Sequence, residues 1–353
     1  AVYGQKGQKL LAQQYTQNPK LWFYPPPSRV GYLFLLSSTM RFFNNYSIAI
    51  GSRLSCFFSI LSLLLLIVLG LRFFNKGTTL YALAFLSVSP IDLAIARRTW
   101  QEALVEFIAT MMLLCTSEII DSPSKITPLI GLIILGGIGL TIKASLFVIF
   151  GLCALFILWT LLFKHKLYKR VVFFLIFSAL VTLISISVIS YELGSFQMLT
   201  TIWTHMSSAM SKNTYAIQHQ SGGLFTMLMS LWFMSPMNLV LFLSGTVMII
   251  SSFKLYAKEQ PVILFLLFFS LALIFIASLT PYCQNIRYIN ATFIPFYLIA
   301  GMTLYSFINH FPINKWLLIL FVTIIFLFLI GDYLMFYSVF IKKNFLDTAL
   351  VIL

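Results

Sequence analysis

Basic residues interrupt the apolar segments of this chain at four places. They are Arg53 in Ser52-Arg-Leu-Ser55, Arg97 and Arg98 followed by Glu102, Lys143 after Leu135-Gly-Gly-Ile-Gly139, and Arg287 followed by Tyr288. A charge at the centre of a membrane-spanning helix costs about 2.5–3.5 kcal/mol on insertion scales, and such residues often mark functional sites. Guanidinium and ammonium groups combine positive charge with hydrogen-bond donors, which suits a phosphate group. If these cations converge, they form a site for a phosphate-bearing ligand.

Each of these residues also has a simpler interpretation. Arg53 can extend its side chain to the membrane interface, and Lys143 and Arg287 can anchor helix ends there. Arg97 and Arg98 can belong to a solvated turn. Glu102 lies four residues after Arg98, which is the spacing of a helical ion pair.

The composition indicates an integral membrane protein. Of 353 residues, 60% are hydrophobic and 9% charged, whereas soluble domains carry about 25% charged residues. The net charge of +14 comes from residues that mostly flank apolar segments, so it fits lipid phosphates and loops rather than nucleic acid. The cysteines (Cys56, Cys115, Cys153, Cys283) show no metal-binding spacing. We expect neither a metal nor a cofactor.

The apolar segments predict an all-α helical bundle that forms a single domain over residues 1–353. Ten segments are long enough to be candidate spans: 47–70, 78–95, 99–116, 126–142, 145–163, 171–190, 224–250, 261–279, 289–308 and 316–338. We expect a tight hairpin at Lys143 and a kink or break at Pro236. Residues 1–46, with short amphipathic helices, and residues 191–223 form the largest loops.

The distribution of basic residues predicts the orientation. One set of loops holds the cluster Lys164-His-Lys-Leu-Tyr-Lys-Arg170 together with Arg72, Lys76, Lys125, Lys254, Lys258 and Lys315. Cytoplasmic loops are enriched in Lys and Arg, so we assign this set to the cytoplasmic side of the plasma or inner membrane. The four interrupting sites then face the periplasm or the exterior.

The segment Trp22-Phe-Tyr-Pro-Pro-Pro-Ser-Arg29 belongs to the same outer side. Pro25, Pro26 and Pro27 cannot extend a helix and favour an extended turn. We expect this turn to bring the first loop onto the membrane, with Arg29 at the depth of the lipid phosphates. A rigid loop with interfacial aromatic residues is the simpler alternative.

Several stretches, in this order, resemble the polytopic glycosyltransferases of the type C membrane superfamily. The similarity is to the branch that holds protein O-mannosyltransferases and lipid A aminoarabinose transferases, and it covers about residues 1–300. The matching features are Pro25-Pro26-Pro27, Arg53, Ser89-Pro90 with Arg97-Arg98 and Glu102, the glycine-rich run from Gly136 to Lys143, and Arg287-Tyr288.

The resemblance implies an inverting transfer of a sugar from a polyprenyl-phosphate donor to a lipid, glycan or protein acceptor at the outer face. Cations would hold the phosphate, whose charge grows as the glycosidic bond breaks. Carried over to this sequence, the phosphate-binding candidates are Lys143, Arg287, Tyr288, Arg53, Arg97, Arg98 and Arg29. Glu102 takes the second acidic position of the catalytic site.

One expected residue of the superfamily is missing. Its principal acid is an Asp in the first outer loop, yet residues 1–50 contain no Asp or Glu. Tyr3 resembles the tyrosine that follows that acid. We therefore expect a further helix and the Asp before Ala1 in the natural protein, and no catalysis by residues 1–353 alone.

Three other functions remain open from the sequence. A transporter or flippase would place charges at the bilayer midplane and often shows internal repeats, which we do not see. A polymerase or ligase of polyprenyl-linked glycans would also use outer cations. A non-catalytic membrane subunit would need no acid.

Overall fold

The computed structural model describes residues 28–99, 101–212, 217, 222–280, 284–310 and 315–342. Regular structure in these residues is helical throughout, as predicted. Tyr3 and Pro25, Pro26 and Pro27 lie outside the described residues.

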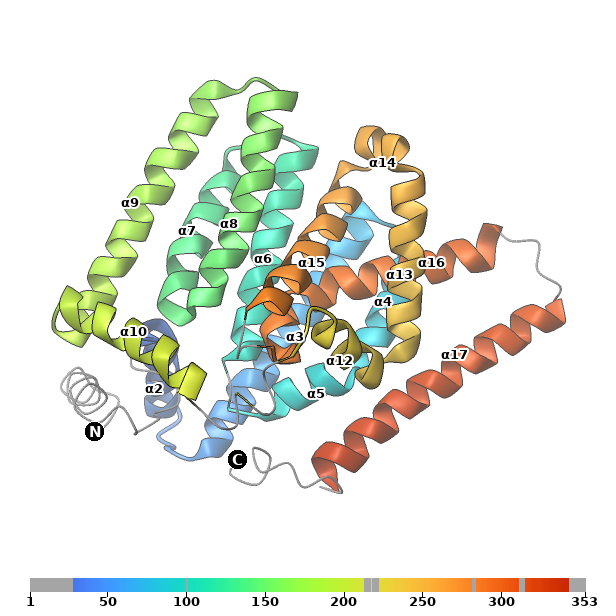
Figure 1. Ribbon diagram of the computed structural model, residues 1–353, viewed down its shortest axis with the longest axis horizontal. Helices are drawn as coiled ribbons and strands as arrows, with labels where there is room; N and C mark the ends of the chain where they lie inside the picture. The colour runs from blue at the N-terminus through green and yellow to red at the C-terminus, as the bar shows by residue number, and fades with distance from the viewer. Residues whose placement is uncertain are drawn as a thin grey trace.

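The helices follow one another along the chain with short links (Figure 1). Their bounds are α2 Val30–Phe42, α3 Ile48–Phe73, α4 Lys76–Ser87, α5 Pro90–Arg97, α6 Glu102–Asp121, α7 Thr127–Ile142, α8 Ala144–Trp159, η1 Thr160–Lys164, α9 Tyr168–Leu193, α10 Phe196–Lys212, α12 Thr226–Met234, α13 Pro236–Ser251, α14 Phe253–Glu259, α15 Pro261–Leu279, η2 Ile286–Thr292, α16 Phe293–His310, α17 Lys315–Phe336 and η3 Tyr337–Ile341. α2 and α10 lie within the two stretches that we predicted as large loops.

The apolar helices agree with the predicted spans. Seven in the described part of the chain are long and apolar enough to cross a membrane, and the number is up to nine if each of two bent pairs counts as one span. α7 is apolar but has 16 residues, or about 24 Å at 1.5 Å per residue, which is shorter than a typical span.

Prolines divide two of the predicted spans. α4 and α5 meet at an angle of 59°, because Pro90 begins α5 and has no N–H to continue the hydrogen bonds of α4. Residues 224–250 form α12 and α13, which are separated at Ser235 by Pro236 in the same way. The predicted span 78–95 is therefore a bent pair, and the expected break at Pro236 is present.

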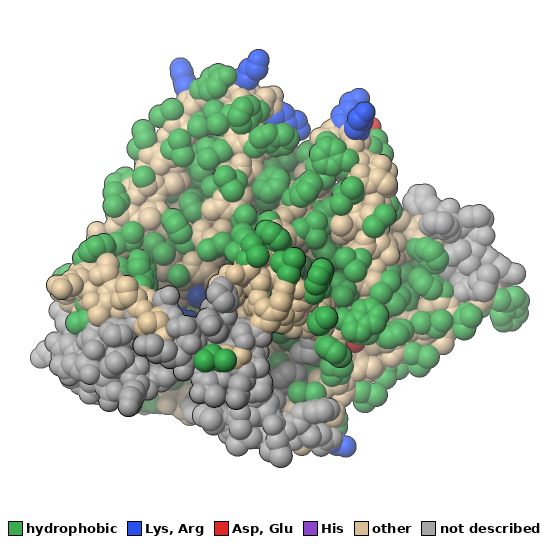
Figure 2. Space-filling model, in the orientation of Figure 1, with side chains coloured by type: hydrophobic (Ala, Val, Ile, Leu, Met, Phe, Trp, Pro, Cys, Tyr) green, Lys and Arg blue, Asp and Glu red, His purple; other side chains and the backbone are tan. Residues whose placement is uncertain are grey.

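The bundle has two ends that differ in charge. We call one the basic end; exposed there are Arg72, Lys76, Lys125, Lys164, Lys166, Lys169, Lys254 and Lys258. Contacts from Arg72 and Lys125 to Glu118, and from Arg170 to the Pro123 carbonyl, join its links. Figure 2 shows Lys and Arg side chains projecting at this end, at the top of the view.

The opposite end, which we call the site end, holds the links between helices that carry the candidate residues. α2, α5, α10 and α12 lie across it, and the tight link from α7 to α8 reaches it (Figure 1). Here some basic atoms are recessed beside α10, and a basic side chain also projects at the lower edge of the view (Figure 2).

The core beside the site is closely packed. A Cβ added at Gly301 of α16 would lie 2.7 Å from the Thr78 carbonyl oxygen and 2.9 Å from the Ala82 nitrogen of α4. Phe242 of α13 stacks on Phe296 of α16 with ring centroids 4.6 Å apart. This packing fixes α16, and with it the preceding η2, relative to the bundle.

α17 lies at the edge of the bundle (Figure 1). Its Asp332 accepts a hydrogen bond of 2.6 Å from the Ser235 hydroxyl at the α12–α13 break. The Phe336 ring lies 5.8 Å from the Arg97 guanidinium carbon of α5. These contacts join α17 to the site end of the molecule.

Candidate phosphate-binding site

Lys143 forms the whole link between α7 and α8. Its backbone is extended, with φ −160° and ψ 132°, and α8 starts at the next residue. The side chain is 6% exposed, and its Nζ lies 3.2 Å from Oε1 of Glu102, which is 1% exposed. The predicted hairpin is therefore present, and it turns Lys143 into the protein to pair with Glu102.

Glu102 begins α6 and is also held through its backbone. Its carbonyl oxygen accepts a hydrogen bond of 2.7 Å from the Asn290 side chain of η2. Asn290 is 1% exposed. Because this bond joins residues 188 positions apart, it fixes η2 against the start of α6.

η2 carries Arg287 and Tyr288 to the same place. The Asn285 side chain accepts a hydrogen bond from the Arg287 N–H at 3.1 Å and begins the short helix. The Tyr288 ring then lies near both cations, with its centroid 4.8 Å from Lys143 Nζ and 5.1 Å from the Arg287 guanidinium carbon. Arg287 also donates a 3.3 Å hydrogen bond to the Tyr288 hydroxyl. Cation–π contacts of this kind hold both charges in place.

Arg29 approaches from the start of α2. Gly31, two residues after Arg29, lies very close to α7. A Cβ added to Gly31 would be 2.3 Å from Oγ1 of Thr141. This close approach brings Arg29 near enough to act electrostatically on Glu102 and on Lys143. We call Arg29, Glu102, Lys143, Arg287 and Tyr288 the cation cluster.

The cluster has an excess of positive charge. Three cations face one carboxylate, which leaves a net charge of 3 − 1 = +2. Burial lowers the pKa of Lys143 to about 8, although the neighbouring Glu102 acts to raise it. A phosphate group would supply the missing negative charge and accept hydrogen bonds from the ammonium and guanidinium groups.

The other predicted cations lie elsewhere. Arg53 is exposed on the first turns of α3, and Arg97 is exposed at the end of α5 beside Phe336. Arg98 is half-buried and ends α5. The Ser52 and Thr99 hydroxyls, 3.3 Å apart, join this turn to α3. The cations that act electrostatically on Glu102 include Lys143, Arg287 and Arg29.

Sequence reasoning missed the residue that ties the cluster together. Asn290 begins the triplet Asn290-Ala-Thr292, which matches the glycosylation sequon only at chance level and does not indicate a contact with α6. Its role depends on a contact with α6, which only the folded chain reveals. The potential metal ligands in the described part of the chain form no group of three or more that could hold an ion.

The fold of this chain is similar to that of a known membrane protein. No protein-family model and no curated protein matches this chain. The crystal structure of ArnT from Cupriavidus metallidurans, bound to undecaprenyl phosphate, has a similar fold with a TM-score of 0.56 and 13% sequence identity. The match covers 84% of this chain and 54% of ArnT, so the chain spans about half the length of that protein. The shared fold is that of a polytopic membrane protein.

Proposed function

We propose that this chain is the membrane part of a glycosyltransferase that uses a polyprenyl-phosphate-linked sugar as donor and acts at the site end of the bundle. The observation that carries the proposal is the cation cluster, in which Lys143 and Arg287 flank the Tyr288 ring with a net charge of +2. The similarity in fold to a protein whose structure holds undecaprenyl phosphate supports the choice of a polyprenyl lipid.

The chemistry of the cluster suits the departure of a phosphate. As the bond between the anomeric carbon and the phosphate oxygen breaks, its electron pair stays on the phosphate. Lys143 and Arg287 stabilise this growing negative charge because their positions are fixed before the reaction. The acceptor oxygen attacks the opposite face of the carbon, and a carboxylate base of the kind that the family resemblance implies takes its proton.

Glu102 has a supporting part in this proposal. It pairs with Lys143 at 3.2 Å and keeps the buried ammonium group charged and oriented when no lipid is bound. The Asn290 hydrogen bond to the Glu102 carbonyl holds Arg287 and Tyr288 at the same end. Acceptor recognition is assigned to the first loop and to the 191–223 region, which includes α10.

The test is transfer of a labelled sugar from polyprenyl-phosphate donors in membranes that contain the full-length natural protein. We expect Lys143→Ala and Arg287→Ala to lose at least tenfold in transfer rate, since each removes a charged hydrogen-bond donor. Lys169→Ala is the matched control, because Lys169 is exposed at the basic end. Equal activity in all three variants would refute the proposed phosphate site.

A further inference from the structure

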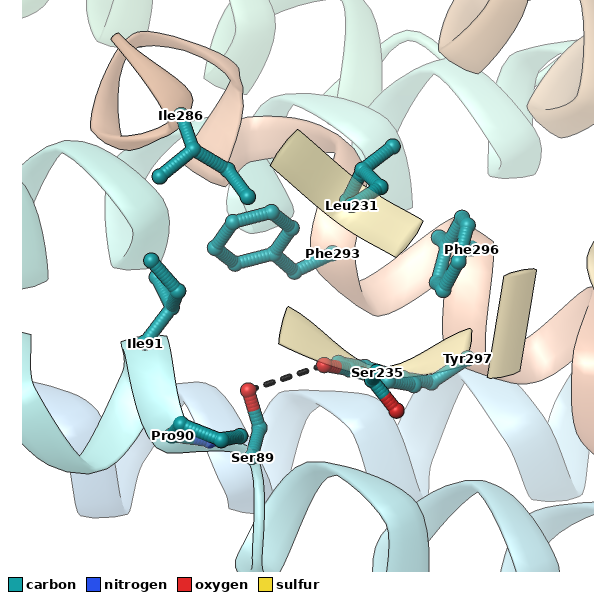
Figure 3. Close-up of a pocket in the computed structure, with 9 residues that line it drawn as sticks. All are labelled: Ser89, Pro90, Ile91, Leu231, Ser235, Ile286, Phe293, Phe296 and Tyr297. Carbon is teal, nitrogen blue, oxygen red and sulfur yellow. Dashed lines mark hydrogen bonds between the residues drawn. The ribbon is translucent and has the colours of Figure 1, made fainter. Parts of the chain in front are cut away.

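A pocket lies between α5, α12, η2 and α16, at the site end of the bundle (Figure 3). The hydroxyl groups of Ser89, Ser235 and Tyr297 line one part of it. Apolar side chains, among them Ile91, Phe293 and Phe296, line the rest. All six of these side chains are largely buried.

The polar part of the pocket offers hydrogen-bond acceptors. The Tyr297 hydroxyl donates to the Ser89 hydroxyl at 2.8 Å, and the Ser235 hydroxyl donates to Asp332 at 2.6 Å. The Ser235 oxygen also accepts a hydrogen bond of 2.7 Å from the Asn238 side chain. A hydroxyl oxygen has two lone pairs, so the Tyr297 and Ser235 oxygens can each still accept a hydrogen bond from a ligand. The carboxyl groups of Asp92, Glu106 and Asp332 lie close enough to act electrostatically on Tyr297.

This arrangement selects a class of ligand. The lining residues include no Lys or Arg, and three carboxyl groups lie behind the hydroxyls, so a phosphate is disfavoured here. A plain hydrocarbon would make no use of the remaining lone pairs of these hydroxyls. A neutral ring with several hydroxyl groups fits both parts, because its hydroxyls donate to the polar part and its C–H face packs on Phe293 and Phe296.

The pocket adjoins the cation cluster through η2. Ile286 lines the pocket, and the next residue, Arg287, belongs to the cluster. The 2.7 Å bond from Asn290 to Glu102 fixes η2 between the two. A ligand with a phosphate and a sugar directly bonded to it could therefore contact both sites at once.

We propose that this pocket receives the sugar of the donor lipid while the cation cluster holds its phosphate. The inference rests on the proposed function and assigns a second subsite to the same ligand. The pocket is narrow in this structure, so a sugar ring requires one wall to move outward. α12 is the wall best suited to do so, because it has nine residues and ends at the Ser235 break.

The test is equilibrium binding to the full-length protein in detergent, with two kinds of probe. One is undecaprenyl phosphate, and the other is the same lipid carrying mannose, glucose or arabinose. We expect the wild type to bind at least one sugar-bearing lipid more tightly than the bare lipid. Tyr297→Phe and Ser89→Ala should weaken that binding about tenfold, as the loss of a buried hydrogen bond predicts, and leave the bare lipid unaffected.

The bare lipid serves as the folding control, since a misfolded variant would lose both kinds of binding. Tyr305→Phe is the matched variant, because it removes a hydroxyl from the same helix outside the pocket lining, and it should change neither affinity. Equal changes for bare and sugar-bearing lipids, or no preference for any sugar in the wild type, would overturn the sugar subsite. Failure of the wild type to bind undecaprenyl phosphate at all would overturn the proposed function as well.

Discussion

Lys143 shows at the scale of one residue how the site is built. A single extended residue joins two helices, which directs its side chain inward instead of into solvent. There it meets the carboxylate of Glu102 and the face of Tyr288. A buried ammonium group needs such partners, because its desolvation costs several kcal/mol. Within the cation cluster, the same surroundings lower the pKa of Lys143 to about 8, so its charge responds to pH.

The first prediction concerns that response. With a pKa of about 8, Lys143 is cationic below that pH and loses its proton above it, whereas the second ionisation of a lipid phosphate, near pH 6, is already complete at pH 7.5. Affinity for undecaprenyl phosphate should therefore fall as the pH rises from 7.5 to 9.5. Bound phosphate favours the ammonium form and shifts the fall upward from pH 8.

Lys143→Arg gives the matched comparison, since a guanidinium group stays charged throughout this range. Its affinity should change much less between pH 7.5 and pH 9.5. Identical pH profiles for the two proteins would show that Lys143 is not the titrating group.

The second prediction separates Glu102 from the phosphate ligands. Glu102→Gln removes the carboxylate, and even when Lys143 releases its proton the two guanidinium groups keep the net charge of the cluster at +2, so bare undecaprenyl phosphate should bind at least as tightly as in the wild type. The free energy of unfolding should fall by about 3 kcal/mol, the lower limit for breaking a buried ion pair, because Lys143 can release its proton. Binding and denaturation curves measure the two effects. Loss of lipid binding would contradict the role of Glu102 as counter-ion.

At the scale of helices, close packing decides which cations meet. α2 reaches α7 only because Gly31 has no side chain, and that contact brings Arg29 toward Lys143. η2 is held by Asn290 and by the helix α16 that follows it. Arg53 on α3 and Arg97 on α5 occupy exposed positions and are not part of the cation cluster.

The third prediction tests the α2–α7 contact. In Gly31→Ala the new Cβ would lie 2.3 Å from Thr141 Oγ1, so α2 must move away and take Arg29 with it. Affinity for undecaprenyl phosphate should fall several-fold while the protein stays folded, because two of the three cations remain. Gly151→Ala is the control, since nothing lies within 4 Å of a Cβ there. An unchanged affinity in Gly31→Ala would show that Arg29 does not contribute.

Most of the helices could be predicted from the sequence, and the features that were missed have physical explanations. Apolar segment length predicted the helices, and Pro236 predicted a break. The bend at Pro90 was missed because the apolar segment continues through it. Short amphipathic helices were expected in residues 1–46, but the bounds of α2 were not predicted. Seven basic or aromatic residues were candidates for the phosphate site. The sequence could not predict which of them come together in the cation cluster, because this depends on packing between segments that are distant along the chain.

At the scale of the whole molecule, the two ends of the bundle differ in where their basic residues lie. The basic end carries many exposed Lys and Arg residues in its links, and the site end carries the buried cation cluster together with some exposed arginines such as Arg53 and Arg97. Exposed cations at one end orient a protein in the membrane, whereas buried ones are retained for a ligand. We propose that the exposed cations set the orientation of the protein and that the buried ones bind a phosphate group.

The fourth prediction tests the orientation in cells. In a cysteine-free background, Lys166→Cys at the basic end should react with an impermeant thiol reagent only after the cytoplasmic side is opened. Ser195→Cys, exposed in the link between α9 and α10, should react from the outside. Labelling of both residues from one side would contradict the two-ended arrangement.

The most direct test of the central claim is the affinity of the full-length protein for undecaprenyl phosphate. Lys143→Met leaves a buried carboxylate near the phosphate and lowers the net charge of the cluster to +1. Lys169→Met removes the same charge at the basic end. We predict at least a tenfold loss of affinity in Lys143→Met, as for a charged hydrogen bond, and wild-type affinity in Lys169→Met. Equal affinities in the two variants would contradict a phosphate site at Lys143.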